Sequence, residues 1–133
     1  MEIVVPEPLI RVAVPASPDV LHLLRSVTAS IGARMSMSLD DVEELRIAVD
    51  EAAALLLDRA GDASGRTLEL ALTCTERSLT ASVSLDGVAG SDEDARASWP
   101  WRVITAVTDD ASVRRANGRM TVTFTKSAPG SDR

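Results

Sequence analysis

Two neighbouring stretches of strict alternation constrain the fold more than any other feature of this 133-residue chain. In residues 68–74, and again in residues 79–85, every second residue is apolar. Such alternation places the apolar side chains on one face of a β-strand. The turn around Glu76 and Arg77 is short, so an antiparallel hairpin is expected. The inward positions are Leu68, Leu70, Leu72 and Cys74, then Leu79, Ala81, Val83 and Leu85.

Two further segments carry strand signals. Residues 9–14 alternate, and residues 113–126 predict a second hairpin with Asn117-Gly118 as its turn. The side chains expected to face inward are Ile10, Val12, Val14, Met120, Val122 and Phe124.

Three segments show the apolar spacing of amphipathic helices. The first follows Ser17-Pro18-Asp19, which supplies a hydroxyl cap, an initial proline and an early acid, and Gly32 is expected to end it. The second starts at Ser38, with Asp41 in a capping-box-like position, and runs to about Ala60. The third covers residues 99–107, and the polar residues 86–97 before it predict a loop.

This order predicts an α+β fold: a two-layer sandwich whose mostly antiparallel sheet carries the helices on one face. We expect a loose segment over residues 1–8, one domain over 9–126, and a disordered tail over 127–133.

Charge and cysteine content narrow the class of function. The net charge is −6, which argues against nucleic acid or an anionic membrane surface as the partner. Cys74 is the only cysteine, which favours a reducing cytoplasm, and we expect it to be buried, with any redox role left open. No apolar stretch is long enough to cross a bilayer, and the N-terminus lacks the pattern of a signal peptide.

The second predicted helix carries two adjacent acids, Asp50 and Glu51, among apolar residues. In the segment LRIAVDEAAALLLDRA, Glu51 and Leu55 lie one turn apart, beside the apolar stripe. An acid at this flank either lines a pocket or is solvated, and the pattern alone leaves both readings open. Glu51 could also pair with an arginine such as Arg59.

This segment resembles the N-box helix of the anti-sigma-factor serine kinases, which belong to the GHKL ATPase superfamily. The family pattern is Leu-x-x-Ala-(Val)-x-Glu-Ala-x-x-Asn, and the stretch SWPWRVITAVTDD is similar to segments of actinobacterial anti-sigma factors. The resemblance covers roughly residues 8–126 and implies the Bergerat-type sandwich. The matching residues are Leu45, Ala48, Val49, Glu51, Ala52 and Ala60.

The resemblance implies a catalytic role that this chain has in part lost. In active members, the N-box Glu polarises the attacking hydroxyl and the Asn holds Mg²⁺ through its side-chain oxygen. Glu51 keeps the first role in degenerate form, whereas Leu55 stands at the Asn position and offers no metal ligand. We therefore expect no metal site.

The family's glycine box, Asp-x-Gly-x-Gly, is also incomplete. In LDGVAG, Asp86 and Gly90 fit the first and last positions, and Val88 replaces the middle glycine. An ordinary strand-end loop is the alternative reading. The loop that follows carries the acids 92–94, and the next helix starts at Ser98 with no glycine and with Pro100, which has no N–H for phosphate. Nucleotide binding through Glu51, Asp86 and Gly90 is therefore expected to be weak or lost.

These features predict an anti-sigma factor that sequesters an alternative sigma subunit of RNA polymerase and is released by an anti-anti-sigma antagonist. The acidic chain complements a basic sigma surface. By its distance from the N-box Glu, Arg25 matches the family's sigma-contacting arginine, although a solvated arginine is the alternative. The resemblance also implies a homodimer formed through the sheet edge and the first helix.

Two other functions remain open. One is an ATP-dependent serine kinase acting on the antagonist, which would need ATP and Mg²⁺. The other is a GHKL-like scaffold with an unrelated partner.

Overall fold

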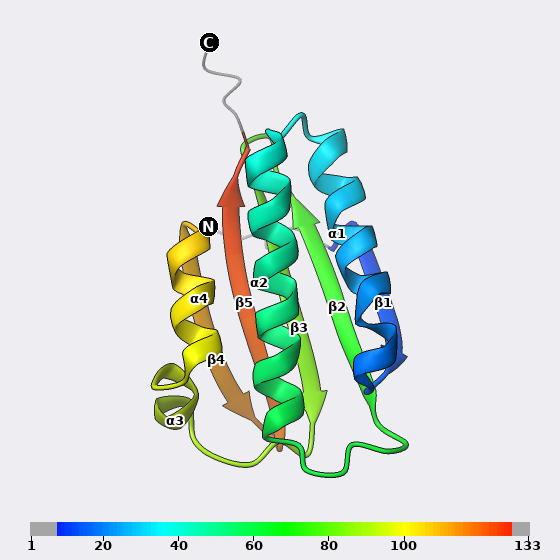
Figure 1. Cartoon of the computed structure of the whole chain (residues 1–133), viewed down its shortest axis with the longest axis vertical. Helices are drawn as coiled ribbons and strands as arrows, with labels where there is room; N and C mark the ends of the chain where they lie inside the picture. The colour runs from blue at the N-terminus through cyan, green and yellow to red at the C-terminus, as the bar shows by residue number, and fades with distance from the viewer. Residues whose placement is uncertain (1–7, 129–133) are drawn as a thin grey trace, which may run out of the picture.

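A five-stranded sheet in which all neighbouring strands are antiparallel forms one layer of the molecule, in the order β1-β2-β3-β5-β4. The computed structural model describes residues 8–128 (Figure 1). Its strands are β1 (Ile10–Pro15), β2 (Thr67–Cys74), β3 (Ser78–Asp86), β4 (Asp110–Ala116) and β5 (Arg119–Ser127).

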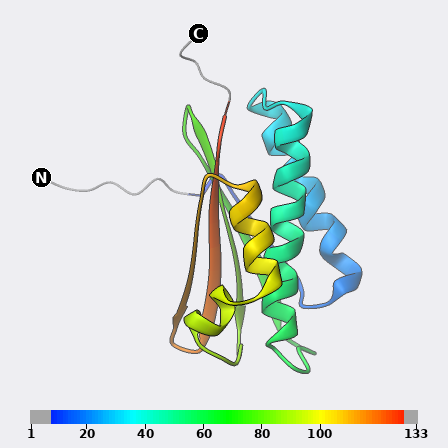
Figure 2. The same ribbon diagram turned by 60° about the vertical axis from the view of Figure 1, so that its left-hand side comes forward.

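Helices form the second layer, all on one face of the sheet (Figure 2). Helix α2 lies along the middle of this face, with α1 on one side and α4 on the other (Figure 1). This arrangement confirms the predicted α+β two-layer fold. The helices are the 3-10 turn η1 (Pro18–Val20), α1 (Leu21–Arg34), α2 (Leu39–Asp58), α3 (Asp92–Arg96) and α4 (Trp99–Val107).

The predicted helix starts are confirmed by their caps. The Ser17 hydroxyl accepts from the Asp19 amide at 3.3 Å, and the Ser38 hydroxyl accepts from the Asp41 amide at 3.0 Å. The predicted stop at Gly32 is wrong, because α1 continues to Arg34. Gly32 instead allows close packing of α1 on α2: a Cβ at this position would lie 3.1 Å from Leu45 Cδ1.

Two other boundaries differ from expectation. Residues 86–97 are not a plain loop, because they contain the short helix α3, which a capping box between Ser91 and Asp94 stabilises. Strand β5 reaches Ser127, one residue into the expected tail, since the Ser127 amide donates to Asp109 at 2.6 Å. Residues 1–7 and 129–133, where a loose start and a tail were expected, lie outside the described residues.

The core lies between the sheet and the helix layer. The alternating residues of β2, β3 and β5 face α2 and are buried, except that Cys74 at the end of β2 is half-buried. Of the predicted inward residues of β1, Val14 is buried, whereas Ile10 and Val12 are half-buried. Partial burial raises the pKa of the Cys74 thiol. The second hairpin has the predicted turn, with φ of 54° at Asn117 and 78° at Gly118. No helix in residues 8–128 combines the length and apolarity needed to span a bilayer.

Candidate functional site

The flank of α2 that carries Glu51 and Leu55 is where the N-box resemblance locates a nucleotide site. Helix α2 packs along α4, and Leu55 has no exposed surface. Glu51 is half-buried, and its carboxylate has no hydrogen-bond or ion-pair partner among residues 8–128. Burial raises the pKa of Glu51, and the neighbouring charges of Asp50 and Asp58 raise it further.

Asp50 and Glu51 are adjacent in sequence, but their side chains lie in different surroundings. Asp50 accepts from Arg25 of α1 at 3.3 Å, so Arg25 bridges the two helices. The Nε atom of Arg25 is buried without a hydrogen-bond partner. Arg59, which could have paired with Glu51, instead donates to the backbone carbonyl of Asp94 at 3.0 Å.

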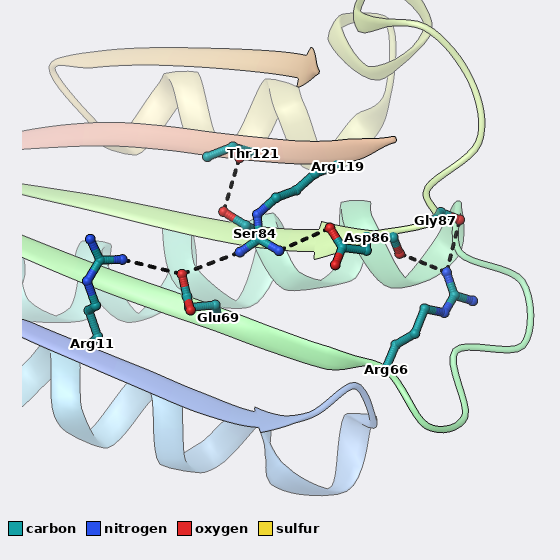
Figure 3. Close-up of polar contacts among 8 residues, drawn as sticks. All are labelled: Arg11, Arg66, Glu69, Ser84, Asp86, Gly87, Arg119 and Thr121. Carbon is teal, nitrogen blue, oxygen red and sulfur yellow. Dashed lines mark hydrogen bonds and ion pairs between the residues drawn. The ribbon is translucent and has the colours of Figure 1, made fainter. Parts of the chain in front are cut away.

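Asp86 lies on the other side of the sheet from Glu51. It is the last residue of β3 and follows Leu85, which is buried under the helices. The side chain of Asp86 is 68% exposed and pairs with Arg119 at 3.1 Å on the open face (Figure 3). The structure therefore does not bring Asp86 and Glu51 together around one ligand.

Gly90 and Val88, the other two positions of the glycine box, make contacts within the chain. Gly90 has a φ of 92°, and its carbonyl accepts from Arg115 of β4. Val88, at the family's middle glycine, is only 1% exposed, and Ala95 of α3 and Ile104 of α4 are fully buried. These side chains belong to the same buried core as Leu55.

Arg66 is the residue at this end of the molecule that the sequence patterns did not single out. Its guanidinium donates to the carbonyls of Asp86 at 2.8 Å and Gly87 at 2.9 Å (Figure 3). It also donates to the carbonyls of Ala60 and Asp62, each at 2.6 Å. Nothing in the loop pattern of residues 61–66 distinguishes this arginine from an exposed one.

The open face of the sheet carries a second polar arrangement (Figure 3). Arg11, Glu69, Arg119 and Asp86 form a chain of ion pairs across the strands, with distances of 3.1–3.5 Å. Beside it, hydroxyl pairs join β3 to β5 at 3.0–3.1 Å: Thr80–Thr125, Ser82–Thr123 and Ser84–Thr121. The charged groups and hydroxyls of the open face therefore find their ion-pair and hydrogen-bond partners within the chain.

Neither of two hollows in residues 8–128 brings the three predicted ligands together. One, of about 550 Å³ on the open face of the sheet, is lined by Asp86 with residues of β4 and β5, and by neither Glu51 nor Gly90. The other, of about 750 Å³, is lined by residues 13–18, by the end of α2 and by residues 61–67, and it does not include Glu51, Asp86 or Gly90. Within residues 8–128, no three His, Cys, Asp or Glu side chains are grouped so that they could hold a metal ion. The ligand roles of these three residues stay predictions.

Comparison with known proteins agrees with this architecture. A family model described as the histidine kinase-like ATPase domain matches residues 14–126. The chain therefore belongs to the histidine kinase-like ATPase family, which confirms the resemblance noted in residues 45–60.

A solved structure of the RsbU and RsbW domains of Rv1364c from Mycobacterium tuberculosis is similar to this chain. The TM-score is 0.70 at 18% sequence identity, over 91% of this chain and 32% of the other. The chain thus spans about a third of that protein, and at this identity the likeness shows the fold alone. No curated protein matches the chain.

Proposed function

We propose that this protein is a cytoplasmic anti-sigma factor that sequesters an alternative sigma subunit of RNA polymerase without needing ATP, and that an anti-anti-sigma antagonist releases it. The observation that carries the proposal is the complete burial of Leu55 at the position of the family's magnesium-holding Asn. Leucine offers no oxygen to Mg²⁺, and its burial leaves no room for a hydrated ion.

Other nucleotide features support the same conclusion. Val88 occupies the core where a glycine would let a nucleotide approach the backbone. The acids of α3, Asp92, Glu93 and Asp94, would repel phosphate, and Pro100 at the start of α4 has no N–H to donate. The segments that bind the nucleotide in active relatives are therefore kept as part of the fold. Binding of a partner protein, not of a nucleotide, carries the function.

Charge supports a basic partner. Helix α2 carries seven acidic residues and one arginine, Arg46. Sigma subunits carry basic surfaces that bind DNA and the polymerase core, so an acidic helix layer would attract them. The acids are Asp40, Asp41, Glu43, Glu44, Asp50, Glu51 and Asp58.

A homodimer is part of the proposal. Strand β1 is an edge of the sheet, so its outer backbone groups are unpaired within the sheet. Leu9 beside this strand and Leu23 on α1 are exposed large apolar residues. Sedimentation equilibrium of the purified protein tests this point, and a monomer at all concentrations would contradict it.

Direct binding tests the main proposal. Each sigma subunit of the source bacterium would be purified and titrated into this protein by calorimetry, with and without Mg-ATP. We expect one alternative sigma subunit to bind equally tightly in both conditions. Binding by none of them would overturn the proposal in favour of a scaffold with an unrelated partner.

A thermal-shift measurement separates the proposal from the kinase alternative. A ligand at 100 times its Kd stabilises a protein by about 2.7 kcal/mol. We expect millimolar Mg-ATP to leave the melting temperature unchanged. A clear increase, together with phosphate transfer to the antagonist, would establish the kinase instead.

Arg25 is the proposed sigma contact. Its side chain is 36% exposed, so part of the guanidinium remains accessible despite the ion pair with Asp50. We expect Arg25→Ala to weaken sigma binding by about tenfold or more, the usual size for an interface arginine. Asp50→Asn, which removes the partner but keeps Arg25, and Arg34→Ala, at an exposed position on the same helix, serve as controls with little effect.

A further inference from the structure

The connection between β3 and α4, residues 87–98, is docked against the domain by its own backbone and side chains. The Gly87 amide donates to the Gly118 carbonyl at 2.8 Å, and the Ala89 amide donates to the Arg59 carbonyl at 2.9 Å. Val88 and Ala95 anchor it in the core. In the nucleotide-binding relatives that the resemblance implies, this is the segment that contains the lid.

Three arginines from three different parts of the chain also donate to the carbonyls of this segment. Arg59, after the end of α2, binds the carbonyl of Asp94, and Arg115 of β4 binds the carbonyl of Gly90. Arg66, just before β2, binds the carbonyls of Asp86 and Gly87. Contacts of this kind restrain backbone position, because the acceptors are main-chain atoms.

Arg66 is the central member of the three. Two of its nitrogens each bind two carbonyls, and the other two acceptors, Ala60 and Asp62, belong to the connection between α2 and β2. One guanidinium therefore ties the end of α2 to the start of the β3–α4 connection. Gly87 fits closely around it: a Cβ there would lie 2.4 Å from Arg66 Nη1, and its φ of 73° also favours glycine.

Four carbonyls around one group make a site that suits a planar cation. A guanidinium presents several N–H donors in a fixed plane, whereas a lysine ammonium is a point charge with three donors. Lysine at position 66 would therefore keep the charge but not the four simultaneous contacts.

We infer that the Arg66 guanidinium acts as a ligand built into the chain, holding the β3–α4 connection closed so that no nucleotide is needed to order it. The inference would explain why sigma binding needs no ATP. In that one respect it rests on the proposed function. It further implies that the four carbonyls form a binding site for a guanidinium ion, which is empty when the arginine side chain is removed.

Chemical rescue of Arg66→Ala tests the inference. Hydrogen exchange of amides 87–97 would be followed in the full chain, with Arg102→Ala, at an exposed position on α4, as the matched control. We expect Arg66→Ala to reduce protection of this segment on the order of tenfold, and Arg102→Ala to leave it unchanged. Guanidinium or methylguanidinium chloride at about 10 mM, far below denaturing concentrations, should restore the protection.

Other solutes and substitutions separate the site from a general effect. Sodium chloride, ammonium chloride and urea at the same concentration should not rescue Arg66→Ala, and Arg66→Lys should lose protection despite its charge. Equal rescue by ammonium, or full protection in Arg66→Lys, would overturn the inference. If Arg66→Ala does not fold, Gly87→Ala provides a second route, because its Cβ displaces Arg66, and it should open the same segment.

The wild-type protein supplies the last readout. We expect the protection of amides 87–97 to be the same with and without Mg-ATP, and an increase with Mg-ATP would overturn the inference. None of these measurements uses a sigma subunit. Failure to find a sigma partner would thus reject the proposed function while leaving the role of Arg66 to be decided by the rescue.

Discussion

Leu55 is the residue on which the proposed loss of Mg²⁺ binding rests. It has the position of a metal ligand in the N-box pattern, but its side chain is part of the core. Placing an Asn at position 55 should therefore not restore the binding of Mg-ATP. We expect Leu55→Asn to lower the free energy of unfolding by roughly 3 kcal/mol, through lost apolar burial and an unsatisfied amide.

Urea unfolding would measure this loss, and calorimetry with Mg-ATP would show no gain in binding. Leu39→Asn is the matched control, because Leu39 is exposed on the same helix and its substitution should cost little. Tight Mg-ATP binding by Leu55→Asn would mean that the site is intact apart from one side chain.

Glu51 is held in an environment that disfavours its charge. Its pKa is raised in the folded state, so the ionised form opposes folding at pH values above the folded pKa. We expect Glu51→Gln to raise the stability at pH 7. The gain should shrink as the pH falls through the folded pKa and disappear below the ordinary pKa of a glutamate, where both the folded and the unfolded state bind the proton.

Urea midpoints between pH 3 and pH 8 would measure this effect, with Glu76→Gln in the exposed β2–β3 turn as control. A stabilisation by Glu51→Gln that is constant over this range would show that the carboxylate charge is not its cause.

Among the elements, β5 packs against the helix layer through its apolar residues and also makes polar contacts to it through Lys126. Lys126 is buried and donates to Glu44 of α2 at 2.6 Å and to the carbonyl of Val107 in α4 at 3.0 Å. Asp41 lies 3.7 Å away. These contacts tie α2 and α4 to the end of β5, so Lys126 helps to set the position of both helices relative to the sheet.

A double-mutant cycle with Lys126→Met and Glu44→Gln would measure this contribution. We expect Lys126→Met to cost about 1–2 kcal/mol, less than a fully buried pair because Glu44 is partly exposed, and the coupling energy to be about 1 kcal/mol. Additive effects of the two substitutions would show that the ion pair contributes nothing.

At the scale of the whole molecule, the uneven charge distribution governs how a partner approaches. The acids of α2 lie in the helix layer, and the chain has a net charge of −6. Raising the salt concentration from about 0.1 M to 1 M shortens the Debye length from about 10 Å to about 3 Å. If the proposed sigma subunit is the partner, its association rate should fall by about tenfold or more, while the dissociation rate changes less.

Stopped-flow mixing over this salt range would measure both rates. Because screening acts on long-range attraction, Arg46→Ala, which makes α2 more acidic, should increase the association rate at low salt and not at 1 M. An association rate that does not change with salt concentration would indicate that a basic partner surface is not involved.

The sequence by itself determined the fold class and most of the elements, but not the short helix α3 or the end of α1. Strict alternation in β2 and β3, the turn at Asn117-Gly118, and the caps at Ser17 and Ser38 are local signals, and each is confirmed. Such signals act over a few residues, so they do not depend on the rest of the fold. The resemblance of residues 45–60 to a known motif also pointed to the family that the family model matches.

Only the tertiary structure decided how the motifs are used. Gly32 reads as a helix stop until α2 is seen packing against it, and the pairing of Asp86 with Arg119 on the open face has no sign in the sequence. Arg66 and Lys126 have no local signature, because their partners are backbone carbonyls and acids distant in sequence. A hydrogen bond between segments 20 residues or more apart exists only once the chain has folded, so no local pattern can predict it.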